Sequence, residues 1–147
     1  MPLPALDRNT GNLPPGVHDA TWDEIVAAFA TNARRTALLE GLLAALRSLK
    51  TAGCTRAYLD GSFVTAKDQP GDFDGCWEAA GVDPEALDPV LLDFIHPRTA
   101  QKAKYSGELF VASSAADPAG TAFLEFFQTD KITGNRKGII AIDLRGL

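Results

Sequence analysis

Two strand-like segments joined by a short loop constrain the fold of this chain most strongly. The first, residues 55–60, is followed by a Gly-Ser turn, and the second, residues 71–77, carries Asp72 and Asp74. Two acids separated by one residue on a strand project from the same face, with Cα atoms about 6–7 Å apart. The pattern therefore predicts a β-sheet that holds two neighbouring carboxylates close to a tight turn.

The turn and the acids together indicate phosphate and metal chemistry. Gly61 allows the backbone to approach a ligand, and Ser62 is typical of a helix start, where N–H groups attract phosphate. Carboxylates spaced like Asp72 and Asp74 bind one divalent cation, or two about 3.5–4 Å apart. A plain helix cap and two solvated acids are the alternative interpretation.

Apolar periodicity predicts helices and strands around this segment. Thr21 and Glu24 form a capping box that starts one helix, and a second helix runs from Asn32, through a leucine stripe, to Gly53. The other expected elements are a kinked helix over 84–95, a helix over 98–105, a strand over 108–112 and a final strand over 139–144. Phe123, Phe126 and Phe127 favour a helix, with a strand as the alternative.

These elements predict a mixed α/β (α+β) fold. We expect a small mixed sheet with the acids on one face, helices on the other, and two extra N-terminal helices that cover the sheet. Residues 1–18 are rich in Pro and Gly and are expected to be an irregular lead-in. The whole chain, residues 1–147, is expected to form one domain.

Composition narrows the functional classes. A net charge of −5 argues against broad nonspecific binding to nucleic acid. No apolar run approaches the roughly 20 residues that span a bilayer, and the N-terminus lacks a signal-peptide pattern, so we expect a cytoplasmic protein without a membrane partner. Cys54 and Cys76 do not have the spacing of a zinc site.

The segment from residue 59 to residue 74 resembles the signature of the DNA polymerase β-like nucleotidyltransferase superfamily. That signature is a hydrophobic residue, Gly-Ser, a loop, and Asp-hydrophobic-Asp, here Asp72-Phe73-Asp74. The longer segment, with Lys67 and Pro70, resembles a family of small bacterial nucleotidyltransferase-like proteins of mostly unassigned function. The C-terminal run 137–144 also resembles the ending of that family.

The resemblance implies a nucleotidyltransferase that uses Mg²⁺ or Mn²⁺ to move a nucleotide from a nucleoside triphosphate to an RNA or protein acceptor. It also implies a toxin–antitoxin or phage-defence component, with a cognate antitoxin or regulator protein as partner. Asp72 and Asp74 would hold the metal, and Gly61 and Ser62 would bind phosphates. Lys67 is either a clamp for the triphosphate or an ordinary exposed lysine.

A site of this type needs a third carboxylate on a neighbouring strand, and three residues are candidates. Glu108 begins an apolar strand after a helix, where the superfamily's third acid usually falls, and is preferred. Asp93 would suit if its segment were a strand, but the spacing there is helical. Asp143 ends the last strand.

A catalytically silent nucleotide- or protein-binding regulatory module is the alternative function. The chain is short, and Gly75-Cys76 replaces more usual residues after the acidic motif. A solvated helix face is the preferred interpretation of Lys102 and Lys104, over a basic surface near the substrate. The remaining cations near a helix start, Arg34 and Arg35, are expected to be surface charges.

Overall fold

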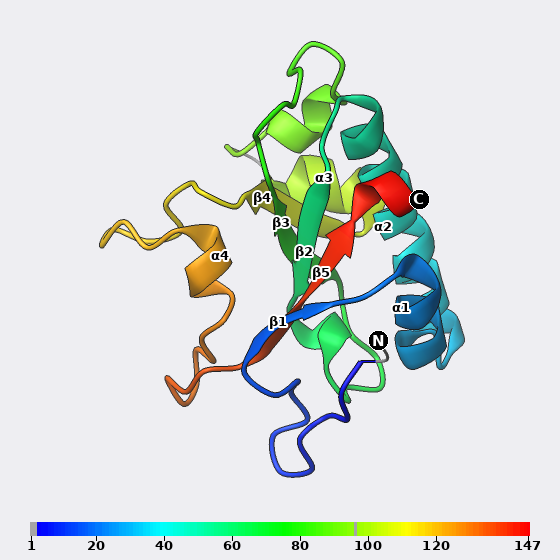
Figure 1. Ribbon diagram of the computed structural model, residues 1–147, viewed down its shortest axis with the longest axis vertical. Coiled ribbons are helices and arrows are strands. Elements are labelled where there is room, and N and C mark those ends of the chain that lie inside the picture. The colour runs from blue at the N-terminus through cyan, green and yellow to red at the C-terminus, as the bar shows by residue number, and fades with distance from the viewer. Residues whose placement is uncertain (1–2, 96) are drawn as a thin grey trace.

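A mixed β-sheet forms the centre of the protein (Figure 1). The computed structural model describes residues 3–95 and 97–147, and within these ranges all side chains except those of Ser62, Pro97 and Arg98. The described strands run in the order β1-β5-β2-β3-β4. Their bounds are β1 Gly16–Asp19, β2 Arg56–Asp60, β3 Phe73–Trp77, β4 Gly107–Val111 and β5 Gly138–Asp143.

Strand direction makes the sheet mixed. Strand β2 is antiparallel to both β3 and β5, whereas β1 is parallel to β5 and β4 is parallel to β3. The predicted α+β class with a small mixed sheet is therefore confirmed.

Apart from the segment 84–95, the helices follow the predicted order. Their bounds are α1 Trp22–Phe29, α2 Ala33–Thr51, α3 Pro97–Tyr105 and α4 Phe123–Phe126, with short 3₁₀ turns η1 Ser62–Val64, η2 Pro89–Leu92 and η3 Leu144–Gly146. The Thr21–Glu24 capping box and the Asn32 cap are both present. Among the described residues, none of the helices is both long and apolar enough to cross a membrane.

The two faces of the sheet are covered differently. Helices α1 and α2 pack on one face, and α4 lies on the other (Figure 1). Because side chains alternate along a strand, Phe73 and Trp77 of β3 enter the core beneath α2. Cys76 packs on the opposite face, which is therefore also the face of Asp74. The acids thus lie away from the two N-terminal helices, as expected.

Two segments differ from the sequence-based predictions. Residues 16–18, expected to be irregular, belong to strand β1, whose backbone pairs with β5 although its own residues are mostly exposed. This strand forms because its backbone pairs with β5, and its sequence has no alternating apolar pattern that would predict it. The kinked helix expected over 84–95 is only the 3₁₀ turn η2, which Asp88 caps and Pro89 begins.

Candidate metal centre

Three acids form a row across neighbouring strands. Asp60 lies opposite Asp74 in the β2–β3 pair, and Asp74 lies opposite Glu108 in the β3–β4 pair. Directly opposed like charges destabilise a sheet. A row of this kind therefore costs stability unless positive charge or bound protons compensate it.

Asp72 joins this row from the residue just before β3. Asp72, Asp74 and Glu108 each offer one carboxylate oxygen, and these oxygens lie within 4.8 Å of one another. The structure thus places Glu108, the preferred third acid, beside the two acids of the motif.

The electrostatics of the cluster favour a cation. Burial, followed by repulsion from Asp72, Glu108 and Asp60, raises the pKa of Asp74 to about 7. Burial also raises the pKa of Asp60. Carboxylate oxygens are the hard ligands that Mg²⁺ and Mn²⁺ prefer, so the residues present fit such an ion.

Two lysines partly neutralise these acids. The Nζ atom of Lys102 lies 2.7 Å from Oδ2 of Asp72 and 3.8 Å from Oε1 of Glu108. The Nζ atom of Lys137 lies 3.0 Å from Oδ1 of Asp60. The charge of Lys131 also acts against the raised pKa of Asp60 and of Asp74.

The sequence did not predict that Lys102, Lys137 and Asp60 belong to this cluster. Lys102 was expected on a solvated helix face, but it reaches the cluster because α3 packs along the edge strand β4. The buried Gln101 side chain fixes this packing by accepting from the Leu109 N–H at 2.8 Å and donating to the Leu109 carbonyl at 3.2 Å. The short turn between α3 and β4 could have indicated that this helix packs along the strand and brings Lys102 to the acids.

The Gly-Ser turn packs against the acids. Gly61 has φ of +83°, and a Cβ atom there would lie 2.7 Å from Oδ2 of Asp74. Gly61 therefore leaves room for the Asp74 carboxylate, a role that the sequence did not predict. Ser62 begins η1, the short helical turn that was expected, but its side chain lies outside the described part of the structure.

Lys67 is exposed, and it contributes a backbone carbonyl to the structure. Among the described residues, the cations paired with the acidic cluster are Lys102 and Lys137 rather than Lys67. Its predicted role as a triphosphate clamp therefore gains no support from its position.

Arg35 holds the loop between the turn and the acids. Its guanidinium is buried and donates to the carbonyls of Phe63 at 2.6 Å, Thr65 at 2.7 Å and Lys67 at 3.2 Å. Arg34 donates to the carbonyls of Pro70 and Gly71. The expectation of a surface charge is thus wrong for Arg35, which is buried because a loop without regular structure needs donors for its carbonyl groups, whereas Arg34 is exposed, as expected.

Arg35→Leu should lower the free energy of unfolding by about 2 kcal/mol, because several loop carbonyls would lose their donors. Arg47→Leu is the control, since Arg47 lies exposed on the same helix. Urea unfolding of both variants measures the difference. Equal stability of the two variants would show that the guanidinium does not hold the loop.

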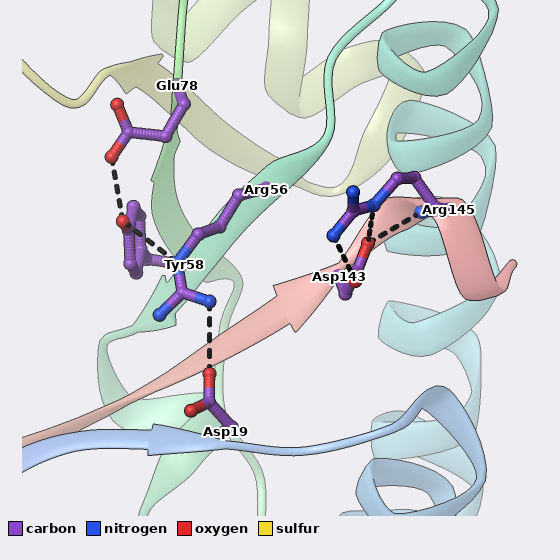
Figure 2. A network of polar contacts seen from close by, with 6 residues as sticks. All are labelled: Asp19, Arg56, Tyr58, Glu78, Asp143 and Arg145. Carbon is purple, nitrogen blue, oxygen red and sulfur yellow. Dashed lines mark hydrogen bonds and ion pairs between the residues drawn. The ribbon is translucent and has the colours of Figure 1, made fainter.

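The other two candidate acids are not among the three whose carboxylate oxygens converge. Asp143 ends β5 opposite Arg56, at the far end of β2 from Asp60, and its bond with Arg145 lowers its pKa to about 2 (Figure 2). Asp93 follows η2, outside any strand, and accepts from the Ile95 N–H.

Figure 2 also shows the polar network at that far end of the sheet. Arg56 bonds to Asp19 and to the Tyr58 hydroxyl, which donates to Glu78 at 2.7 Å. These groups satisfy one another, and the network is separate from the acidic row.

Fold and site together define a small α+β protein in which one face of the sheet carries three converging carboxylates. The chain belongs to the Family of unknown function (DUF6932), which matches residues 4–143. No curated protein and no solved structure matches the chain.

Proposed function

We propose that this protein is a nucleotidyltransferase that uses Mg²⁺ or Mn²⁺ to move a nucleotide from a nucleoside triphosphate to an RNA or protein acceptor. The observation that carries the proposal is the convergence of Asp72, Asp74 and Glu108, with carboxylate oxygens within 4.8 Å of one another. The reaction type comes from the resemblance of residues 61–74 to the polymerase β-like signature. From the same resemblance we propose that the protein works in a toxin–antitoxin or phage-defence system.

The chemistry follows from these groups. The acceptor hydroxyl attacks the α-phosphorus of the triphosphate, a new P–O bond forms, and the bond to pyrophosphate breaks. Asp72, Asp74 and Glu108 would hold the cation, and an oxygen of Glu108 that is not bound to it would take the hydroxyl proton. The cation, when bound, neutralises charge on the phosphates. Gly61 leaves room for the Asp74 carboxylate.

A silent binding module is the second candidate, and one observation favours it. The Lys102 ammonium already lies between Asp72 and Glu108. A protein that has lost catalysis can keep such a built-in cation where a metal once bound. Nucleotide or a partner protein would then bind without turnover.

Transfer of label decides between the two candidates. The protein is incubated with each labelled nucleoside triphosphate, Mg²⁺ and total cellular RNA or protein. We expect transfer by the wild type, and a loss of about 100-fold or more in Glu108→Gln, which keeps shape and removes charge. Asp143→Asn is the control and should transfer normally.

Two results would contradict the proposal. Equal transfer by Glu108→Gln and the wild type would remove Glu108 from the site. Binding of nucleotide by the wild type without any transfer would identify the silent module.

A further inference from the structure

Lys102 occupies the position that a cation would take between two of the proposed metal ligands. Its Nζ atom is 2.7 Å from Asp72 and 3.8 Å from Glu108, and its side chain keeps 31% exposure. The helix beneath it is fixed to β4 by the two bonds between Gln101 and Leu109. The fold therefore places the ammonium beside the two acids. The lysine side chain is long and partly exposed, so the ammonium can also move away from them.

An ammonium group and a divalent cation compete for the same oxygens, because a carboxylate oxygen that bonds to Lys102 is less available to a metal. We propose that Lys102 acts as an internal lock: its ammonium group blocks metal binding by pairing with the carboxylates. The lock opens when the ammonium moves to the phosphates of a bound polyphosphate, so that the divalent cation and the polyphosphate bind together. This inference rests on the proposed function, since it assumes that Asp72 and Glu108 bind metal.

The other lysine of the cluster is built for a different role. Lys137 and Asp60 expose only 15% and 7% of their side chains, so their pair is held in place. The Lys102 pair is more open, and its partner Asp72 is 23% exposed. A flexible lysine with three donors is well suited to move from a carboxylate to a phosphate.

Because the ammonium opposes metal and favours polyphosphate, its removal should change the affinities for these two ligands in opposite directions. Without the ammonium, the carboxylates are free for metal, and metal alone binds more tightly. Without the ammonium, a polyphosphate loses a cationic partner, and its metal complex binds more weakly. A purely structural lysine would not change the two affinities in opposite directions.

The test compares the affinities of Lys102→Met and the wild type for two probes. The probes are Mn²⁺ alone and Mn²⁺ with inorganic tripolyphosphate, which carries the phosphate chain without a base, and calorimetry and the spin resonance of free Mn²⁺ measure binding. We expect Mn²⁺ alone to bind at least about tenfold more tightly to Lys102→Met, and the tripolyphosphate complex at least about tenfold more weakly. Lys102→Arg should bring both affinities part of the way back to their wild-type values.

Lys104→Met is the matched control. Lys104 lies on the same helix, but its Nζ atom pairs with Asp88 at 2.6 Å, away from the cluster. Both of its affinities should equal those of the wild type. If Mn²⁺ binds the wild type and Lys102→Met equally, the lock is wrong and the metal centre stands. If Mn²⁺ binds neither protein, the lock and the proposed metal centre are both wrong.

Discussion

Asp74→Asn should be more stable than the wild type at pH 8 in the absence of divalent metal, by about 2–4 kcal/mol. In the folded protein the pKa of Asp74 is raised to about 7, from an ordinary value of 3.8. Between these values the folded state binds more protons than the unfolded state, so stability falls as the pH rises from about 4 to about 7. Asparagine carries no charge and removes this loss.

Chemical unfolding of both proteins at several pH values measures the effect, with a chelator present. Asp143→Asn is the control, because the pKa of Asp143 is lowered to about 2 and its loss should leave the fall between pH 4 and pH 7 intact. If the free energy of unfolding depends on pH in the same way in Asp74→Asn and in the wild type, ionisation of Asp74 is not what destabilises the cluster.

Adding metal should reverse this order of stability. Mn²⁺ binds the folded carboxylates and stabilises the wild type by mass action, whereas Asp74→Asn lacks one ligand and gains far less. Thermal melting at pH 7.5 with and without Mn²⁺ compares the two proteins. An equal rise in melting temperature would contradict a metal site at Asp74.

Gly61→Ala should lower the affinity for Mn²⁺ at least about tenfold and lower the free energy of unfolding by about 2 kcal/mol or more. The new Cβ atom would lie 2.7 Å from Oδ2 of Asp74, in a residue with φ of +83°. The carboxylate must move, and the backbone is strained as well. Mn²⁺ titration and urea unfolding measure the two losses.

Gly120→Ala separates strain from contact. Gly120 has φ of +82°, almost the same as Gly61, but nothing lies within 4 Å of its added Cβ atom. It should lose about 1–2 kcal/mol from strain and keep its Mn²⁺ affinity. If Gly61→Ala also keeps its Mn²⁺ affinity, the turn does not position Asp74.

The acids of the motif could be placed from the sequence because they depend on local geometry. The two-residue period of a strand puts Asp74 on the face opposite Phe73, and the order helix, turn, strand puts Glu108 at the start of β4. Parallel pairing of β3 and β4 then brings Glu108 to Asp74. The place of Asp74 follows from a pattern within one segment, whereas the choice of Glu108 also rested on the resemblance, and its contact with Asp74 depends on the pairing of β3 with β4.

The cations and the fourth acid could not be placed in this way. Asp60 looks like the last residue before a turn, and its neighbours become known only from the register of β2 with β3 and β5. Lys102 and Lys137 reach the acids through the packing of whole elements. Arg35 was misjudged for the same reason, since its loop carbonyls lie about thirty residues away in sequence.

The most direct test of the metal centre is a crystal structure with Mn²⁺ and tripolyphosphate, with the ion located by its anomalous scattering. We expect one Mn²⁺ in direct coordination with oxygens of Asp72, Asp74 and Glu108, and the Lys102 ammonium moved from Asp72 to a phosphate oxygen. Crystals that contain no Mn²⁺ at these three carboxylates, with Lys102 still paired to Asp72, would contradict the account.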